Sequence, residues 1–340
     1  MTDTTHTEPD QAERSSRSGD AEVVEHADQA SWRAKFTVVR EFACRAELSA
    51  FYRAVGRGDF VSVARGVYLE SDLWHALDRH DRYRTLIKAA AITDQSAVFS
   101  HHSAAALWRL PWVGDWPRRV HAVVPPRAGG CSTSLVIRHT TGNQESPATI
   151  DGLAVTPLAR TVVDVASVAT FEQSVAAADA ALRRTAHPLS DIPRTFLTRE
   201  DLEGELDRIP LTHGARKAWE VIEFSNGLAD RPGESVSRVS MFRARLPMPE
   251  LQVELAGVSG RIWHVDFWWP PSNLIGEFDG KWKYTDPEFR RGRTSAQVLL
   301  DEKDREDDLR AAGHGFARWD WSVAVSPAKL RDRLRAAGLR

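Results

Sequence analysis

The pattern of apolar positions divides the chain into front, middle and rear regions behind a polar start. Residues 1–31 are polar and acidic and show no helical or strand period, so we expect a disordered tail. From Trp32 to Val55, apolar residues recur at roughly helical spacing, and a glycine-punctuated pair of short strands follows in 56–69. Helices followed by a small β-hairpin predict a winged helix-turn-helix over 32–73.

The middle region, 74–190, mixes helical and strand-like patterns and predicts a mixed α/β fold. Its helical patterns cover 81–91, 159–169 and 171–183, its strand-like runs cover 119–124 and 153–156, and 97–108 predicts a short strand or turn leading into a helix capped near Ser103. The next segment, 191–230, predicts a linker with a short helix begun at Thr198 and an amphipathic helix over 215–224.

The rear region, 231–340, predicts the order helix, strand, strand, strand, helix, strand. The helices are expected at 235–245 and 295–312, and the strands at 251–255, 262–269, 274–284 and 316–319. The Pro-Pro-Ser-Asn break at 270–273 is strong turn chemistry, so the third strand should return beside the second as a hairpin. The whole chain is therefore predicted to be a multidomain α/β (α+β) protein.

Charged residues interrupt two runs of the rear region that otherwise have the pattern of buried strands. Asp266 lies among apolar and aromatic residues, where an unpaired carboxylate is costly to desolvate, and the hairpin should bring it near Glu277. The odd-numbered positions of the second run should share one face: Glu277, Asp279, Lys281 and Lys283. Alternating charges usually mark a solvent face. Two adjacent carboxylates, however, repel, so one keeps its proton or a divalent cation lies between them.

These residues resemble the core of the PD-(D/E)XK nuclease superfamily, and within it the branch related to very-short-patch-repair endonucleases, which is common in actinobacterial proteins. The resemblance covers roughly 231–340 and rests on Asp266, ten intervening residues, Glu277-Phe278-Asp279-Gly280, Lys281 and Lys283, the charged run 302–306, and Phe316-Ala317-Arg318-Trp319. It implies a restriction-endonuclease-like α/β core that hydrolyses phosphodiester bonds in DNA with Mg²⁺ or Mn²⁺.

The resemblance also implies roles for individual residues. Asp266 and Glu277 would hold the metal ion, with Glu234 from the preceding helix as a further ligand, although an acid there also suits the helix dipole. Asp279 occupies the position where the basic residue of the superfamily is expected, so it would be a further ligand or a water-orienting group. The cation that stabilises the charged phosphate is then open among Lys281, Lys283 and Lys303.

The charged run 301–308 lies in the last long predicted helix. Such runs usually form a solvated face with pairs such as Asp301 and Arg305. Because eight consecutive charges wrap around most of a helix, some must face the sheet. Lys303 or Arg305 could then compensate the carboxylates and hold a phosphate.

The front region is similar to the N-terminal domain of abortive-infection type IV antitoxins, which are DNA-binding repressors. The similarity rests on Arg65-Gly66-Val67-Tyr68 and the helical pattern before it, and 155–164 resembles the middle of the same proteins. Few basic residues lie in the expected recognition helix and wing, so a protein-interaction module is an equal alternative. We assign no catalysis to 74–190, because the adjacent His101 and His102 should diverge rather than share a metal ion.

The amino-acid composition further narrows the possible classes of protein. Among 340 residues, 42% are hydrophobic and 27% charged, as in ordinary globular proteins, and no apolar run or leader suits a membrane or secretion. Cys44 and Cys131 are far apart, which argues against zinc and disulfides and fits the reducing cytoplasm. The net charge of −2 conceals eight acids against two arginines in 1–31 and 19 Lys/Arg against 16 Asp/Glu in 231–340.

The sequence thus supports a metal-dependent endonuclease acting in defence, repair or a toxin–antitoxin context. The alternative is a non-catalytic DNA-binding, antitoxin-like regulator that retains a nuclease fold, which the Asp279 departure favours. A third hypothesis is a toxin–antitoxin protein whose partner is another polypeptide, bound through the middle region. Nothing resembles a nucleotide-binding P-loop.

Overall fold

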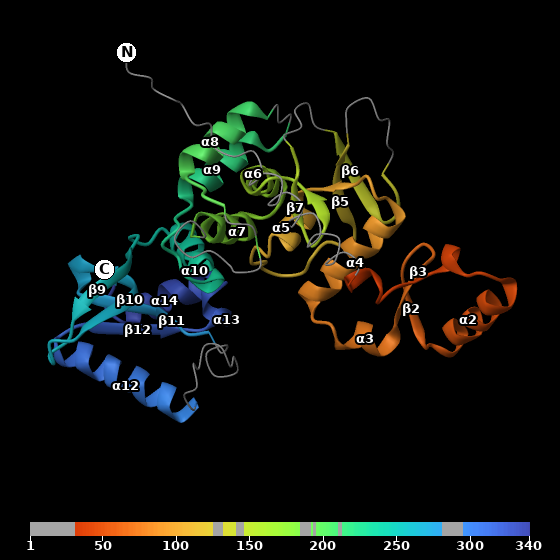
Figure 1. Cartoon of the computed structure of the whole chain (residues 1–340). Coiled ribbons are helices and arrows are strands. Elements are labelled where there is room, and N and C mark those ends of the chain that lie inside the picture. The colour runs from red at the N-terminus through yellow and green to blue at the C-terminus, as the bar shows by residue number, and fades with distance from the viewer. Residues whose placement is uncertain are drawn as a thin grey trace, which may run out of the picture. The chain divides into compact units, whose positions relative to one another are not determined.

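A computed structural model describes 31–124, 132–140, 146–183, 192, 195–209, 213–280 and 295–340. The chain packs as two compact units (Figure 1), the first formed by Met1–Trp108 with Trp116–Pro157 and the second by Arg109–Asp115 with Leu158–Arg340. Among the described residues, no helix is both long and apolar enough to cross a membrane. The predicted tail, 1–31, lies outside the described residues except for Ser31.

The first unit begins with a small sheet of order β1-β3-β2 beside one helix. Its elements are β1 (Thr37–Val38), η1 (Val39–Glu41), α2 (Arg45–Arg57), β2 (Phe60–Ala64) and β3 (Val67–Glu70). The predicted strand pair is confirmed, because β2 and β3 form an antiparallel hairpin. The helical pattern predicted before residue 44 is wrong, since Thr37 and Val38 pair with β3. Val38 lies in β1 and Val39 begins η1, so the apolar residues there do not line one face of a helix.

The rest of the first unit is a five-stranded mixed sheet, of order β6-β5-β4-β8-β7, with helices. Its elements are α3 (Ser71–Ala76), α4 (Arg79–Thr93), β4 (Val98–Phe99), α5 (His101–Leu107), β5 (Val120–Val124), β6 (Val136–Thr140), β7 (Ala148–Ile150) and β8 (Leu153–Val155). Ser100, not Ser103, precedes α5. Ser103 lies within the helix, where its hydroxyl accepts the His121 N–H at 2.8 Å and lies 3.0 Å from the Tyr83 hydroxyl.

The second unit opens with helices that include the predicted linker. They are α6 (Leu158–Val168), α7 (Phe171–Arg183), α8 (Arg199–Arg208), α9 (Ala215–Phe224) and α10 (Pro232–Arg243). The capping box that begins α8 is present, with Thr198 and Asp201 bonding each other's backbone N–H groups. A buried ion pair joins α7 to α10, with Asp179 Oδ2 and Arg238 Nη1 2.9 Å apart. Helices from the predicted middle region therefore pack directly on the rear region.

The remainder of the second unit is a sheet of order β12-β11-β10-β9 between helices. Its elements are β9 (Glu250–Ala256), β10 (Ile262–Trp269), η2 (Pro270–Ser272), β11 (Leu274–Phe278), α12 (Ser295–Ala311), β12 (Gly315–Trp319), α13 (Trp321–Ala324) and α14 (Pro327–Ala336). The predicted order of helices and strands is confirmed from α10 to β12. The predicted hairpin is also confirmed, because Trp269 pairs with Leu274.

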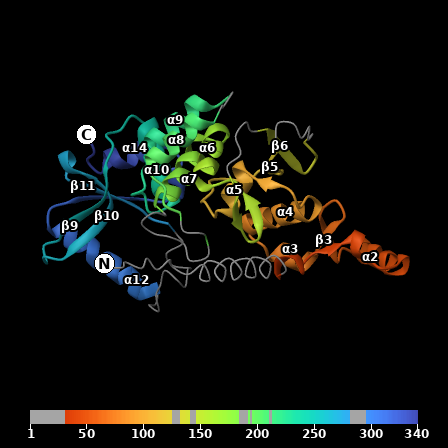
Figure 2. The same cartoon turned by 45° about the horizontal axis from the view of Figure 1, so that its top comes forward.

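Helices cover the two faces of this sheet (Figures 1 and 2), with α12 on one side and α10 and α14 on the other. Phe267, Leu274 and Phe278 join the core on the α10 and α14 side. Val265, Ile275 and Leu309 form a smaller core beneath α12. Side chains that alternate along β11 therefore enter two different cores.

Helix α10 comes very close to the end of β11. A Cβ atom on Gly233 would lie 2.1 Å from the Phe278 ring, so only glycine permits this approach. The strand β11 ends at Phe278, earlier than the predicted limit at 284. Asp279 thus lies beyond the strand, and Lys281 and Lys283 lie outside the described residues.

Candidate functional site

Glu234 is a buried carboxylate in the first turn of α10. Its side chain is only 3% exposed, and Oε2 accepts hydrogen bonds from the Asp230 backbone N–H at 2.8 Å and from Gln252 Nε2 at 3.1 Å. Burial, and then the nearby charge of Asp266, raise the pKa of Glu234 well above its usual value. The charge of Asp266 therefore acts on Glu234 in addition to its burial.

Gln252 is a residue of this site that the sequence reasoning missed. Val253 pairs with Val265 and Leu251 with Phe267, which places Gln252 opposite Asp266 across the β9–β10 ladder. Its backbone has φ of 52°, in the left-handed region that a non-glycine side chain rarely adopts. Such strain clusters at functional sites. Because Leu251-Gln252-Val253-Glu254-Leu255 alternates apolar and polar residues, Gln252 had the pattern of an ordinary solvent-facing position.

Asp266, on β10, contacts the end of β11. Its Oδ2 accepts the Phe278 backbone N–H at 3.0 Å. The ladder between β10 and β11 ends with the pair Phe267 and Gly276, and the bond to the Phe278 N–H, one residue after Glu277, brings Asp266 near Glu277, as predicted. The carboxylate of Asp266 is thus held at the end of the strand β11.

Glu277 is also buried, at 3% exposed, and two arginines compensate its charge. Arg305 Nη2, from α12, lies 2.6 Å from its carboxylate, and Arg318 Nη2, from the adjacent strand β12, lies 3.1 Å away. Arg305 also donates to the His264 carbonyl at 2.9 Å. Lys303 or Arg305 was expected to face the carboxylates, and of these two Arg305 contacts Glu277. Arg318 was not predicted as a site residue, because its parallel pairing opposite Glu277 is invisible in local sequence.

The remaining predicted residues are less closely held. Asp279 donates its backbone N–H to the Trp319 carbonyl at 2.8 Å, while its buried Oδ1 has no hydrogen-bond partner among the described residues. Lys303 lies on α12 with an exposed side chain. Lys281 and Lys283 lie outside the described residues, so their predicted roles stay predictions.

A divalent ion would find few protein ligands at this site. In the described part of the chain, no group of three or more His, Cys, Asp or Glu side chains is arranged to hold a metal ion. Mg²⁺, however, usually binds through one or two carboxylates and completes its shell with water and substrate phosphates. The repelling pair Glu234 and Asp266 fits that mode. Glu277 fits it only when released from Arg305 and Arg318.

A second polar cluster lies in the first unit and contains four histidines. His101 and His102 begin α5, His121 lies on β5 and His139 on β6. The rings of His101 and His139 stack at 3.7 Å, those of His102 and His121 are 4.6 Å apart, and His121 Nδ1 lies 2.9 Å from His139 Nε2. The expectation that His101 and His102 diverge is wrong, because His101 has a left-handed backbone, with φ of 49°.

Comparison with known proteins gives relatives without a described activity. No protein-family model matches the chain. Two proteins of Mycobacterium tuberculosis, the uncharacterized protein MT2308 of strain CDC 1551 / Oshkosh and the uncharacterized protein Rv2248 of strain H37Rv, are each 31% identical over 146 residues, or 43% of this chain. The chain spans about half the length of these relatives, 50% in each case. The crystal structure of the RV2827C protein from the same species aligns with 68% of this chain and 87% of its own, at 15% identity and a TM-score of 0.35.

Proposed function

We propose that the second unit is a metal-dependent endonuclease-like domain that hydrolyses phosphodiester bonds in DNA. The observation that carries the proposal is the buried carboxylate of Glu234 in the first turn of α10, which is bonded to Gln252 of β9 and has its pKa raised by burial and by the charge of the half-buried Asp266. Buried like charges are costly unless a proton or a cation compensates them. The order of elements from α10 to β12, with Glu277 on β11, adds support, because the resemblance to PD-(D/E)XK nucleases implies the same order.

Each residue then has a role that its contacts suggest. Glu234 and Asp266 would hold Mg²⁺ or Mn²⁺, an ion that activates water and polarises the phosphodiester when bound. Gln252 and the Asp230 N–H orient the carboxylate of Glu234. Arg305 and Arg318 bring positive charge to Glu277. The residue two positions after Glu277 is Asp279, where the resemblance implies a lysine. A phosphate that develops charge would be stabilised by these guanidinium groups.

The test is cleavage of supercoiled plasmid by the full-length protein with Mg²⁺ or Mn²⁺. Glu234→Gln and Asp266→Asn keep side-chain shape and remove the negative charge, so each should abolish cleavage. Asp207→Asn is the matched control, since Asp207 is an exposed acid of α8 in the same unit and should keep full activity. Cleavage that persists in both site variants, or that ignores EDTA, refutes the proposal.

One observation favours a second candidate, a non-catalytic DNA-binding regulator. Glu277 already has two cationic partners in this structure, so its charge needs no metal ion. A ligand that binds only the folded state raises thermal stability. The endonuclease should therefore melt at a higher temperature in Mn²⁺ than in EDTA, with Asp266→Asn insensitive to the ion, whereas the regulator should show no shift.

For the first unit we propose the antitoxin-like role that its front region suggests. The helix α2 beside the three-stranded sheet β1-β3-β2 is compatible with a winged helix that contacts DNA or a toxin-like protein partner. A protein acting on DNA in these ways would belong in the cytoplasm. Co-purification of one specific polypeptide with the full chain would favour the protein partner over DNA.

A further inference from the structure

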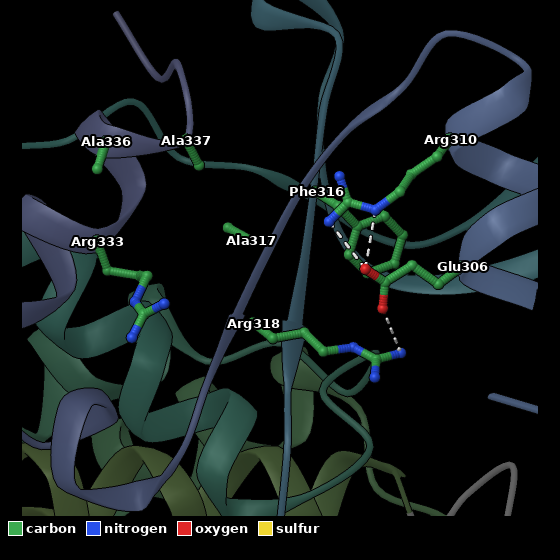
Figure 3. A pocket seen from close by; sticks show the side chains of 8 residues that line it. All are labelled: Glu306, Arg310, Phe316, Ala317, Arg318, Arg333, Ala336 and Ala337. Atoms are coloured by element: carbon green, nitrogen blue, oxygen red, sulfur yellow. Dashed lines mark hydrogen bonds and ion pairs between the residues drawn. The ribbon is translucent and has the colours of Figure 1, made fainter. Parts of the chain in front are cut away.

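A cationic pocket of about 360 Å³ lies next to the carboxylate site, at the edge of the second unit's sheet. It is lined by Glu306 and Arg310 of α12, by Phe316, Ala317 and Arg318 of β12, and by Arg333, Ala336 and Ala337 on and after α14. Figure 3 shows Arg310 and Arg333 on opposite sides of β12. The lining thus contains three arginines and one glutamate, which makes it a site for an anion.

The arginines of the α12 side are held in position. The guanidinium carbons of Arg310 and Arg318 lie 5.4 and 5.5 Å from the centroid of the Phe316 ring, so one aromatic ring supports both groups. Glu306 binds Arg310 at 2.8 Å and Arg318 at 3.4 Å. These contacts fix the two guanidinium groups, and because Arg318 also contacts Glu277, both of them have an acidic partner.

Arg333 completes the pocket from the other side. Its side chain is exposed, and no ion pair joins it to another residue of the described chain. It belongs to a basic helix, because α14 also carries Lys329, Arg331 and Arg335 against one acid, Asp332. Lys329 and Arg333 are four residues apart and so share one face of the helix, and two cations in line suit a repeated anion such as a nucleic-acid backbone better than a single small anion.

Arg318 connects the pocket to the carboxylate site. The same Nη2 atom lies 3.1 Å from Glu277 and 3.4 Å from Glu306. Within the described sheet, β12 is a terminal strand, so the pocket opens at an edge that a long ligand can approach. A phosphate bound in the pocket would compete with Glu277 for Arg318.

We propose that this pocket binds a backbone phosphate of the DNA substrate, and that Arg333 is one of its phosphate-binding residues. The inference rests on the proposed function, since it places the DNA next to Glu277. Binding in the pocket draws Arg318 toward the phosphate and away from the carboxylate. The pocket thereby couples occupancy by DNA to the charge state around Glu277.

The test measures binding of the full-length protein to a labelled DNA duplex of about 20 base pairs, or two turns of B-DNA, in EDTA and at several salt concentrations. The variant Arg333→Ala loses one phosphate contact. Its affinity for the duplex should fall roughly tenfold, and the slope of log affinity against log salt concentration should become shallower by about 1. Arg333→Lys should keep the slope, because it keeps the charge. Arg216→Ala is the matched control, since Arg216 on α9 has a side chain that is 93% exposed.

The outcomes separate this inference from the proposed hydrolysis. Arg333-dependent binding in EDTA, without cleavage in Mg²⁺, supports the pocket and refutes the hydrolysis. If the unaltered protein cleaves DNA but Arg333→Ala binds the duplex as tightly as Arg216→Ala does, the pocket is refuted and the hydrolysis is retained. Absence of duplex binding by the unaltered protein overturns the inference. Binding of a poly-glutamate peptide is measured in parallel. The inference is also overturned if Arg333→Ala loses affinity for this peptide but not for the duplex, because that result assigns the pocket to an acidic protein segment.

Discussion

Arg318 lies directly opposite Glu277 in the neighbouring parallel strand, and its guanidinium Nη2 is 3.1 Å from the Glu277 carboxylate. Arg305, on helix α12, lies 2.6 Å from the same carboxylate through its Nη2 atom. The two arginines differ in burial, because the side chain of Arg305 is 19% exposed and that of Arg318 is 28% exposed. Glu277 therefore depends more on Arg305.

Arg305→Ala should lower the free energy of unfolding by about 2–4 kcal/mol, because it leaves a buried carboxylate with one partner. Arg318→Ala should cost less, about 1–2 kcal/mol, since Arg305 remains. Urea unfolding of the full chain measures both, with Arg216→Ala as the control for loss of an exposed arginine. Equal costs for the two variants would contradict the unequal burial.

Glu234→Gln should stabilise the metal-free protein at alkaline pH. The pKa of Glu234 is higher in the folded than in the unfolded chain, so the folded state keeps this proton and loses stability as pH rises through the folded pKa. The loss is at most about 1.4 kcal/mol per pH unit for one group. A glutamine side chain does not titrate, so the variant avoids this loss of stability, and its amide oxygen still accepts the Asp230 N–H.

Melting temperatures of the two proteins in EDTA from pH 4 to 9 provide the measurement. The curves should separate increasingly as pH rises above the ordinary pKa of glutamate, about 4.3. A Gln variant that is less stable at pH 8 would show that Glu234 is ionised and satisfied. Because Mg²⁺ requires the ionised carboxylate, metal affinity of the unaltered protein should increase over the same range.

Gly233→Ala should destabilise the second unit by about 1–3 kcal/mol, because the added methyl group overlaps the Phe278 ring. Gly204→Ala is the matched control, since Gly204 lies in α8 with no atom within 4 Å of a built Cβ. There the same change should stabilise by about 0.5–1 kcal/mol through helix propensity. Thermal unfolding of both variants tests the close approach of α10 to β11, and a tolerated Gly233→Ala would argue against it.

The histidine cluster should make the first unit sensitive to acid. Burial and neighbouring positive charge lower the pKa of His102 to about 4 and of His121 to about 3, so the unfolded chain binds more protons below the ordinary value of 6.5. Stability should fall as pH drops below about 6.5, by at most about 1.4 kcal/mol per pH unit for each histidine.

The substitution His102→Gln should shift the acid-unfolding midpoint to lower pH, as followed by tryptophan fluorescence. His75→Gln is the control, because His75 is exposed on α3. An unchanged midpoint in His102→Gln would mean that the cluster is not what acid disrupts.

Local patterns predicted the elements better than the contacts between them. The alternation around Asp266 and the turn after Trp269 indicated the hairpin, because both signals lie within a few residues of sequence. Arg318 was missed because its contact with Glu277 depends on the parallel pairing of β11 with β12, across the intervening α12. The apolar residues before Cys44 were assigned to a helix because their pairing with β3 is equally non-local.

Backbone conformation accounts for the other differences. Gln252 and His101 both adopt positive φ, which turns their side chains to directions that regular strand or helix geometry does not give. Sequence patterns assume regular geometry, so they could predict neither Gln252 beside Glu234 nor His101 beside His139. Both residues belong to polar clusters, where such local irregularity is common.

The buried pair of Asp179 and Arg238 determines how the chain can be dissected. A fragment begun at residue 231 keeps Arg238, with its side chain 7% exposed, but loses the carboxylate that neutralises it. It also strips α10 of its packing against α7 and so loosens the helix that carries Glu234. A shortened version intended for crystallisation or metal titration should therefore begin upstream of α7, and failure of the shorter piece would say nothing about the chemistry of the site.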